Sequence, residues 1–149
     1  MRAAILVFLL AANSAGADPS RKAALHLLAG YEPTATAADF VRLGQGIDRV
    51  LISIARDPTT TRLLRQRAMA ALGTVPTEAG RAFLADVVRK QRGATSGADL
   101  IDLYTAVRAF GRFGLSAEPV LRSIRLHPSP DVRRAADDAL AQIAQSHRQ

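Results

Sequence analysis

The chain has 149 residues, of which 20 are basic and 13 acidic, a formal net charge of +7 and no cysteine. Without cysteine it has no disulfide, metal–thiolate site, thiol nucleophile or lipid anchor attached through a thioether. The length suits one stable domain. The basic excess favours an acidic partner, although the basic residues are dispersed from Arg21 to Arg148, which is typical of solvated helix faces.

The first seventeen residues have the three-part plan of a secretory signal peptide. One positive charge at Arg2 precedes an apolar run over residues 3–12, and small and polar residues then lead to Ala17. The run has about ten residues, whereas a membrane-spanning helix needs roughly twenty. We expect cleavage after Ala17, a periplasmic or secreted protein, and a mature chain of 132 residues (149 minus 17) without a membrane span. An uncleaved signal anchor or a buried N-terminal helix is the alternative.

Residues 18–146 are predicted to form a single all-α domain, followed by a polar tail at 147–149. The segment shows no sustained alternation of apolar and polar residues and no Asn-Gly or Asp-Gly turn, so we expect no β-strand. A first helical hairpin is predicted at 20–44. Within it, Thr36 and Asp39 resemble a capping box at the start of the second helix.

A second hairpin is predicted at 46–74. Its first helix has one apolar stripe at helical spacing, made of Ile47, Val50, Leu51 and Ile54. This helix is expected to end at Asp57, because the following Pro58 disfavours helical geometry in the residue before it. The threonines at 59–61 are able to cap the next helix, which Gly73 ends. Such a short connection makes the two helices antiparallel.

Two further hairpins are predicted at 77–114 and 115–146. The second helix of the third hairpin is expected to run as far as Phe113. The second helix of the fourth begins with Ser-Pro-Asp at 129–131, where serine is an N-cap, proline suits the first helical position and aspartate meets the positive end of the helix dipole.

The second helices close on a recurring step, in which an apolar residue precedes Gly or Ala: Leu43-Gly44, Leu72-Gly73, Phe110-Gly111 and Leu140-Ala141. These steps are 29, 38 and 30 residues apart, a period that is typical of helical repeat arrays. The segments 57–73 and 127–140 resemble the second helix of a HEAT repeat, and 98–114 resembles it less closely. The resemblance covers residues 46–146. It implies a short right-handed α-solenoid of three to four antiparallel hairpins, and a protein-binding scaffold or adaptor.

Catalytic and metal-binding patterns are absent from the sequence. The three histidines, His26, His127 and His147, lie in separate segments, and none pairs with a carboxylate or a second histidine three or four residues away on a regular helix. Asp137 and Asp138 are adjacent in a helix and therefore diverge, which favours solvated surface over an acid–base pair. We expect no catalytic residue, no cofactor and no metal.

One surface is a candidate binding site. In HEAT-like arrays the second helices line the concave face, and arginine binds carboxylates in bidentate fashion. The candidate partner-binding residues on these helices are Arg62, Arg65, Met69, Tyr104, Arg108, Arg112, Arg133 and Arg134. Ordinary solubilising positions are the alternative.

The sequence therefore predicts an exported, non-enzymatic protein–protein interaction module whose partner has an acidic segment. An enzyme accessory, such as a HEAT protein of the lyase type, is a second hypothesis. A nucleic-acid-binding HEAT protein is a third, if the N-terminus is not an export signal, since arginines also suit phosphates. Export argues against nucleic acid as the partner.

Overall fold

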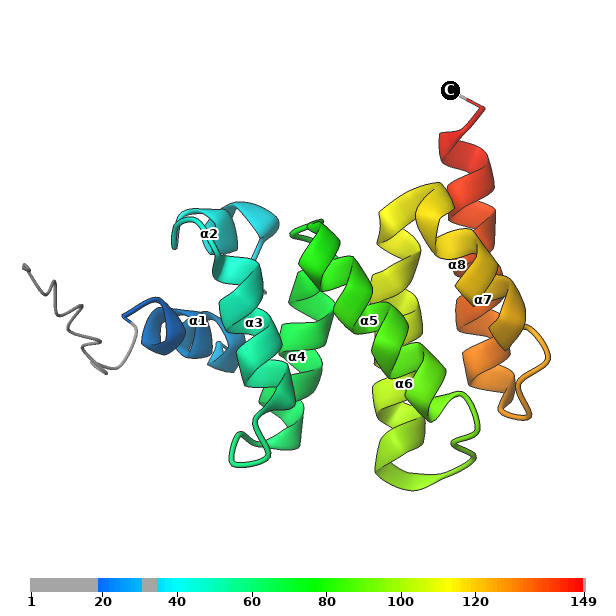
Figure 1. Ribbon diagram of the computed structural model, residues 1–149, viewed down its shortest axis with the longest axis horizontal. Coiled ribbons are helices and arrows are strands. Elements are labelled where there is room, and N and C mark those ends of the chain that lie inside the picture. The colour runs from blue at the N-terminus through cyan, green and yellow to red at the C-terminus, as the bar shows by residue number, and fades with distance from the viewer. Residues whose placement is uncertain (1–18, 31–34, 149) are drawn as a thin grey trace, which may run out of the picture.

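The computed structural model describes residues 19–30 and 35–148 (Figure 1). The predicted signal peptide at 1–17 lies outside the described residues. Those described contain helices and no strand, which confirms the all-α prediction for them. In chain order the elements are α1 (Pro19–Ala29), α2 (Ala37–Val41), α3 (Ile47–Arg56), α4 (Arg62–Leu72), α5 (Glu78–Gln91), α6 (Gly97–Phe110), the 3-10 helix η1 (Gly111–Ala117), α7 (Glu118–Ile124) and α8 (Pro130–Ser146).

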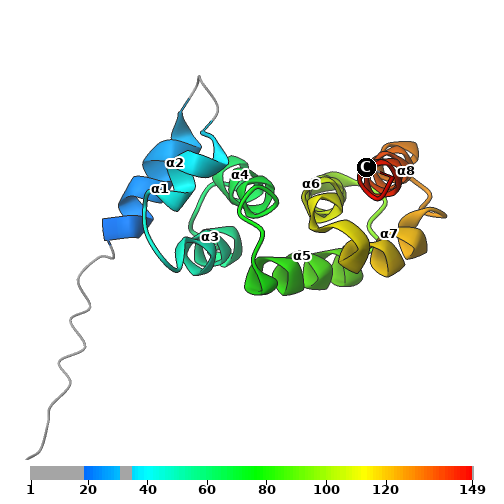
Figure 2. The same cartoon turned by 90° about the horizontal axis from the view of Figure 1, so that it is seen from above.

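Successive helices pack side by side in pairs: α3 with α4, α5 with α6, and α7 with α8. The partners of each pair run in opposite directions (Figure 1). Figure 2 shows two rows, in which α3, α5 and α7 lie on one side and α4, α6 and α8 on the other. Within the second row α4 contacts α6, and α6 contacts α8. At the N-terminal end α1 packs against α3 and α4.

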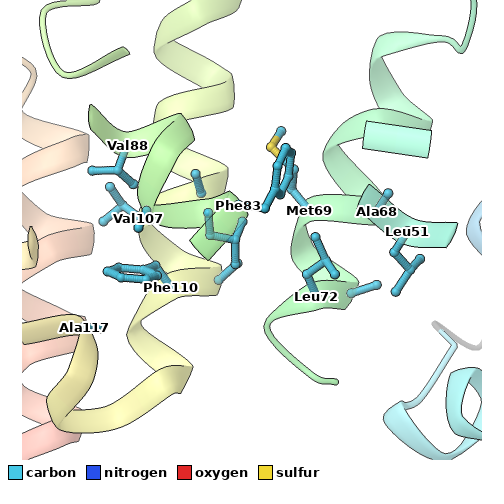
Figure 3. Packing of buried hydrophobic residues seen from close by; sticks show 14 of the residues in the cluster. Leu51, Ala68, Met69, Leu72, Phe83, Val88, Val107, Phe110 and Ala117 are labelled. Carbon is cyan, nitrogen blue, oxygen red and sulfur yellow. The ribbon is translucent and has the colours of Figure 1, made fainter. Parts of the chain in front are cut away.

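Apolar side chains between the two rows form a continuous core (Figure 3). On α3 the predicted stripe faces inward, with Leu51 and Ile54 fully buried. On α6 the buried residues include Leu103, Val107 and Phe110, each with no exposed surface. Burial of each such side chain stabilises the fold by about 1.5–3 kcal/mol. Helical spacing therefore identifies most of this core.

Glycines allow the second-row helices to approach closely. A Cβ atom added to Gly73, at the end of α4, would lie 2.7 Å from the backbone oxygen of Ala109 and 2.9 Å from its Cα atom. At the end of α6, a Cβ atom on Gly111 would lie 2.5 Å from the Cβ atom of Ala139 on α8. A close approach of backbones requires a residue without a side chain. The same small-residue contact thus joins α4 to α6 and α6 to α8.

The helix α6 ends at Phe110, three residues before the predicted Phe113. The chain continues as the 3-10 helix η1, in which Gly114 has a φ of 64°. This left-handed conformation favours glycine and reverses the direction of the chain before α7. Gly111 is the C-cap of α6 and still has helical backbone angles, so the departure from helical geometry occurs at Gly114.

Helix starts follow the predicted caps in part. The capping box of Thr36 and Asp39 is present at the start of α2. At α4 the N-cap is Thr61, without a side-chain bond to the helix. The hydroxyl groups of Thr59 and Thr60 instead donate to the Asp57 carboxylate, at 2.6 and 3.2 Å.

Asp57 also accepts a hydrogen bond of 2.5 Å from Arg21 of α1. The bonds from Thr59, with a smaller effect of Arg21, hold the pKa of Asp57 below its ordinary value. This carboxylate therefore connects α1 to the turn between α3 and α4.

No helix in the described part of the chain is both long and apolar enough to cross a membrane.

Candidate functional site

A groove of about 630 Å³ crosses the second-row helices. Residues from α4, α6, η1 and α8 line it: Gln66, Arg67, Ala70, Tyr104, Thr105, Arg108, Ala109, Arg112, Asp131, Arg134, Ala135, Asp138, Ala139 and Gln142. Four of these residues are alanines, and two of them, Ala109 and Ala139, lie where α6 approaches α4 and α8. Four arginines and two aspartates give the lining a net charge of +2.

Three of the groove arginines are available to a partner. Arg108, Arg112 and Arg134 are exposed, and the described residues offer none of them an ion pair. The guanidinium of Arg108 lies over the ring of Tyr104, 5.7 Å from its centroid. Such stacking leaves the edge of the guanidinium, with its fork of N–H donors, available to a carboxylate.

The fourth arginine, Arg67, has a structural role. Its Nη1 atom donates to the backbone oxygens of Leu28 and Gly30, at 2.6 and 3.1 Å. These oxygens belong to the end of α1, where the helix dipole is negative and a cation is stabilising. Arg67 therefore ties α4 to α1 and adds positive charge to one end of the groove.

Within the described lining, the carboxylates of the groove all belong to α8. Asp131, Arg134 and Asp138 are spaced by three and four residues, so they share one face of the helix. The neighbouring Asp137 points elsewhere and accepts a hydrogen bond of 2.6 Å from Arg125. This separation agrees with the expected divergence of Asp137 and Asp138.

The structure brings together four of the eight candidate residues. Tyr104, Arg108, Arg112 and Arg134 all line the groove. The other four lie elsewhere: Arg62, Arg65, Met69 and Arg133.

Two of these belong to another face of α4. Arg65 and Met69 line a separate hollow of about 270 Å³, which they share with Phe83 of α5. Figure 3 shows Met69 beside Phe83. Met69 is only 4% exposed and belongs to the core. Arg62 is exposed at the start of α4 and is not among the groove lining. Arg62, Arg65 and Met69 are spaced by three and four positions, so they lie on one face of α4. Gln66 and Ala70 lie on the face that lines the groove.

Arg133 stabilises the turn before α8. Its Nη1 atom donates to the backbone oxygens of His127 and Pro128, at 2.7 and 2.8 Å. His127 is 4% exposed, and its Nδ1 atom accepts a hydrogen bond of 3.1 Å from the backbone N–H of Ser129. The guanidinium and the imidazole both satisfy groups of this turn, and neither faces the groove.

Sequence reasoning missed the groove contributions of Gln66, Asp131 and Asp138. The spacing of Asp131, Arg134 and Asp138 was a readable signal, because it places two carboxylates on one face with an arginine. Gln66 carried no such signal. Its side chain donates to Asp102 on α6 at 2.8 Å, a contact 36 residues away in the chain.

A second hollow, of about 480 Å³, lies between α7 and α8 at the C-terminal end. Its charged residues pair with one another, as Arg122 does with Glu118 and Arg125 with Asp137. Paired charges have little left to offer a ligand, so the second-row groove is the stronger candidate site.

The groove suits recognition of carboxylates. In the described part of the chain, no group of three or more His, Asp or Glu side chains is placed to hold a metal ion. The guanidinium groups of Arg108, Arg112 and Arg134 have the donor geometry to bind a carboxylate through two hydrogen bonds. Comparison of the chain with family models, with curated proteins and with solved structures finds no match.

Proposed function

We propose that this chain is an exported, non-enzymatic protein–protein interaction module. In this proposal the helix pairs form a short right-handed HEAT-like solenoid, and the second-row groove binds an acidic segment of a partner. The observation that carries the proposal is the cluster of Arg108, Arg112 and Arg134 in one groove, exposed and without ion pairs among the described residues.

Two features support a solenoid. The helix pairs are arranged in two rows (Figure 2), and contacts along the second row join each helix to the next. The close approach of Gly73 to Ala109 recurs as that of Gly111 to Ala139. Repetition of one contact between successive units is the defining property of a repeat array. A groove that crosses several units is the usual binding surface of such arrays.

The partner is an acidic peptide segment because of charge and geometry. Unpaired guanidinium groups in a groove attract carboxylates over long range and bind them through paired hydrogen bonds. A nucleic acid fits less well. Its continuous phosphate backbone would meet the carboxylates of Asp131 and Asp138 inside the same groove.

Binding of a labelled hexaglutamate peptide at low salt tests this function. The variant R108E/R112E/R134E is expected to weaken binding at least about tenfold, since exposed charge pairs contribute about 0.2–1 kcal/mol each and reversal adds repulsion. The matched control is R49E/R89E/R92E, which changes the net charge equally at exposed positions outside the groove. Equal weakening in both variants would mean that only net charge matters, and would remove the groove from the proposal.

Export is tested separately. Residues 1–25 fused to a reporter that is active only after export are expected to give activity, and replacement of the apolar run at 3–12 by polar residues is expected to abolish it. A reporter that stays inactive would contradict export.

A further inference from the structure

Charges in the groove are divided between its two sides. The side formed by α6 and η1 contributes Arg108 and Arg112 and no carboxylate to the described lining. The side formed by α8 contributes Asp131 and Asp138, with Arg134 between them. A ligand that crosses from α6 to α8 therefore leaves a cationic region and enters one that holds two carboxylates.

The two aspartates on α8 are available to a ligand. Both side chains are exposed, and neither forms an ion pair within the described residues. They are seven residues apart, which corresponds to a rise of about 10 Å along the helix. Arg134 lies on the same face between them without an ion pair to either. Both carboxylates are therefore open to a cationic group of a ligand.

We infer that the partner segment has mixed charge, with an acidic block over Arg108 and Arg112 and a basic block over Asp131 and Asp138. This inference rests on the proposed function of the groove and specifies its ligand. Packed helices are about 8–10 Å apart, and an extended chain advances about 3.3 Å per residue. The two blocks are therefore separated by about two to three residues.

Mixed charge also explains why aspartates are placed in a groove of arginines. A purely acidic segment that crosses to α8 would approach Asp131 and Asp138, and like charges repel. Selection between partners requires such repulsive elements as well as attractive ones. The groove then favours a segment of alternating blocks over one that is only acidic.

Two labelled peptides with the same acidic block test the inference. The first is Glu-Glu-Gly-Ser-Lys-Lys and the second is Glu-Glu-Gly-Ser-Gln-Gln, both with blocked ends. We expect the lysine peptide to bind about threefold to tenfold more tightly, the effect of two exposed charge pairs. Long-range attraction to the positively charged protein would instead favour the glutamine peptide, because it is the more negative of the two.

A double variant separates the contacts from general charge effects. In D131N/D138N the preference for the lysine peptide is expected to disappear, as its affinity falls and that of the glutamine peptide rises. The control D99N removes one exposed carboxylate outside the groove lining, half the charge change of the double variant, and is expected to keep the preference.

The outcomes distinguish the inference of mixed charge from the proposed function on which it rests. Equal binding of both peptides, or tighter binding of the glutamine peptide, would overturn the inference of mixed charge and leave an acidic ligand in place. Loss of the preference in D99N as well would also overturn it. Failure of both peptides and of hexaglutamate to bind would contradict the proposed function itself.

Discussion

Substitution of Gly73 by alanine tests the contact that joins α4 to α6. The added Cβ atom would lie 2.7 Å from the backbone oxygen of Ala109, which is 0.7 Å below the 3.4 Å at which ordinary contact begins. A backbone atom cannot rotate away as the end of a side chain can, so α6 has to shift relative to α4. Overpacking of this kind costs about 1–3 kcal/mol.

A smaller effect opposes this cost. Replacement of glycine by alanine restricts the unfolded chain and stabilises the fold by about 0.4–1 kcal/mol when the conformation allows it. Gly73 has a φ of −68°, so alanine adopts its backbone conformation without strain. We expect a net loss of about 1–2 kcal/mol. In a folded region of roughly 130 residues this lowers Tm by about 4–7 °C.

Thermal unfolding followed by circular dichroism measures the loss, with Gly93→Ala as the control. A Cβ atom at Gly93 meets nothing within 4 Å, and Gly93 is not among the glycines with positive φ. This control is expected to keep the Tm of the wild type or to raise it slightly. A Gly73→Ala protein as stable as the wild type would refute the close approach of the two helices, and an equal loss in Gly93→Ala would refute its assignment to that contact.

Two other predictions concern the turns that hold the rows together. Hydrogen bonds from Thr59 hold the pKa of Asp57 below its ordinary value, so the stability that Asp57 supplies is present above the unfolded-state pKa, near 4, and is lost as pH falls through the folded-state pKa. Asp57→Asn is therefore expected to lower Tm at pH 7 and to make the decrease of Tm between pH 5 and pH 2 less steep. A pH dependence of Tm equal to that of the wild type would contradict this. Arg133→Ala is expected to lower the free energy of unfolding, measured with urea, by about 0.5–1.5 kcal/mol, since it removes the donor of hydrogen bonds to the oxygens of His127 and Pro128. A variant as stable as the wild type would contradict this role and show that water replaces the guanidinium.

Local sequence patterns predicted the helices and much of the core. Spacing alone placed Leu51 and Ile54 on the buried face of α3, because an amphipathic helix has only one apolar side to bury. The end of α6 was predicted three residues late, at Phe113. The Phe110-Gly111 closing step was the better local signal, because α6 ends at Phe110 with Gly111 as its C-cap, and the chain leaves helical geometry at Gly114.

The groove was predicted only in part. On α6 the position of Arg108 follows directly from the apolar stripe. On α4 the apolar side is wide, since Ala68 and Met69 are both buried, and the sequence does not fix how the helix is rotated about its axis. Met69 was therefore assigned to the surface. The tie of Arg67 to the end of α1 spans 37 residues or more and was not predictable from local spacing.

Disulfide trapping tests the central claim, that an acidic segment docks in the second-row groove. The natural chain has no cysteine, so a single introduced thiol is unique. Thr105→Cys places it in the groove on α6, one turn from Arg108, and Ala82→Cys places it on the exposed surface of α5, in the first row. The probes are hexaglutamate and hexaglutamine peptides, each with an activated terminal cysteine.

The trapping rate of the glutamate peptide is divided by that of the glutamine peptide, which removes the intrinsic reactivity of each thiol. Docking raises the local concentration of the peptide near Thr105→Cys, so this ratio is expected to exceed that at Ala82→Cys by about tenfold or more. Equal ratios at the two positions, or a larger ratio at Ala82→Cys, would contradict docking in the groove.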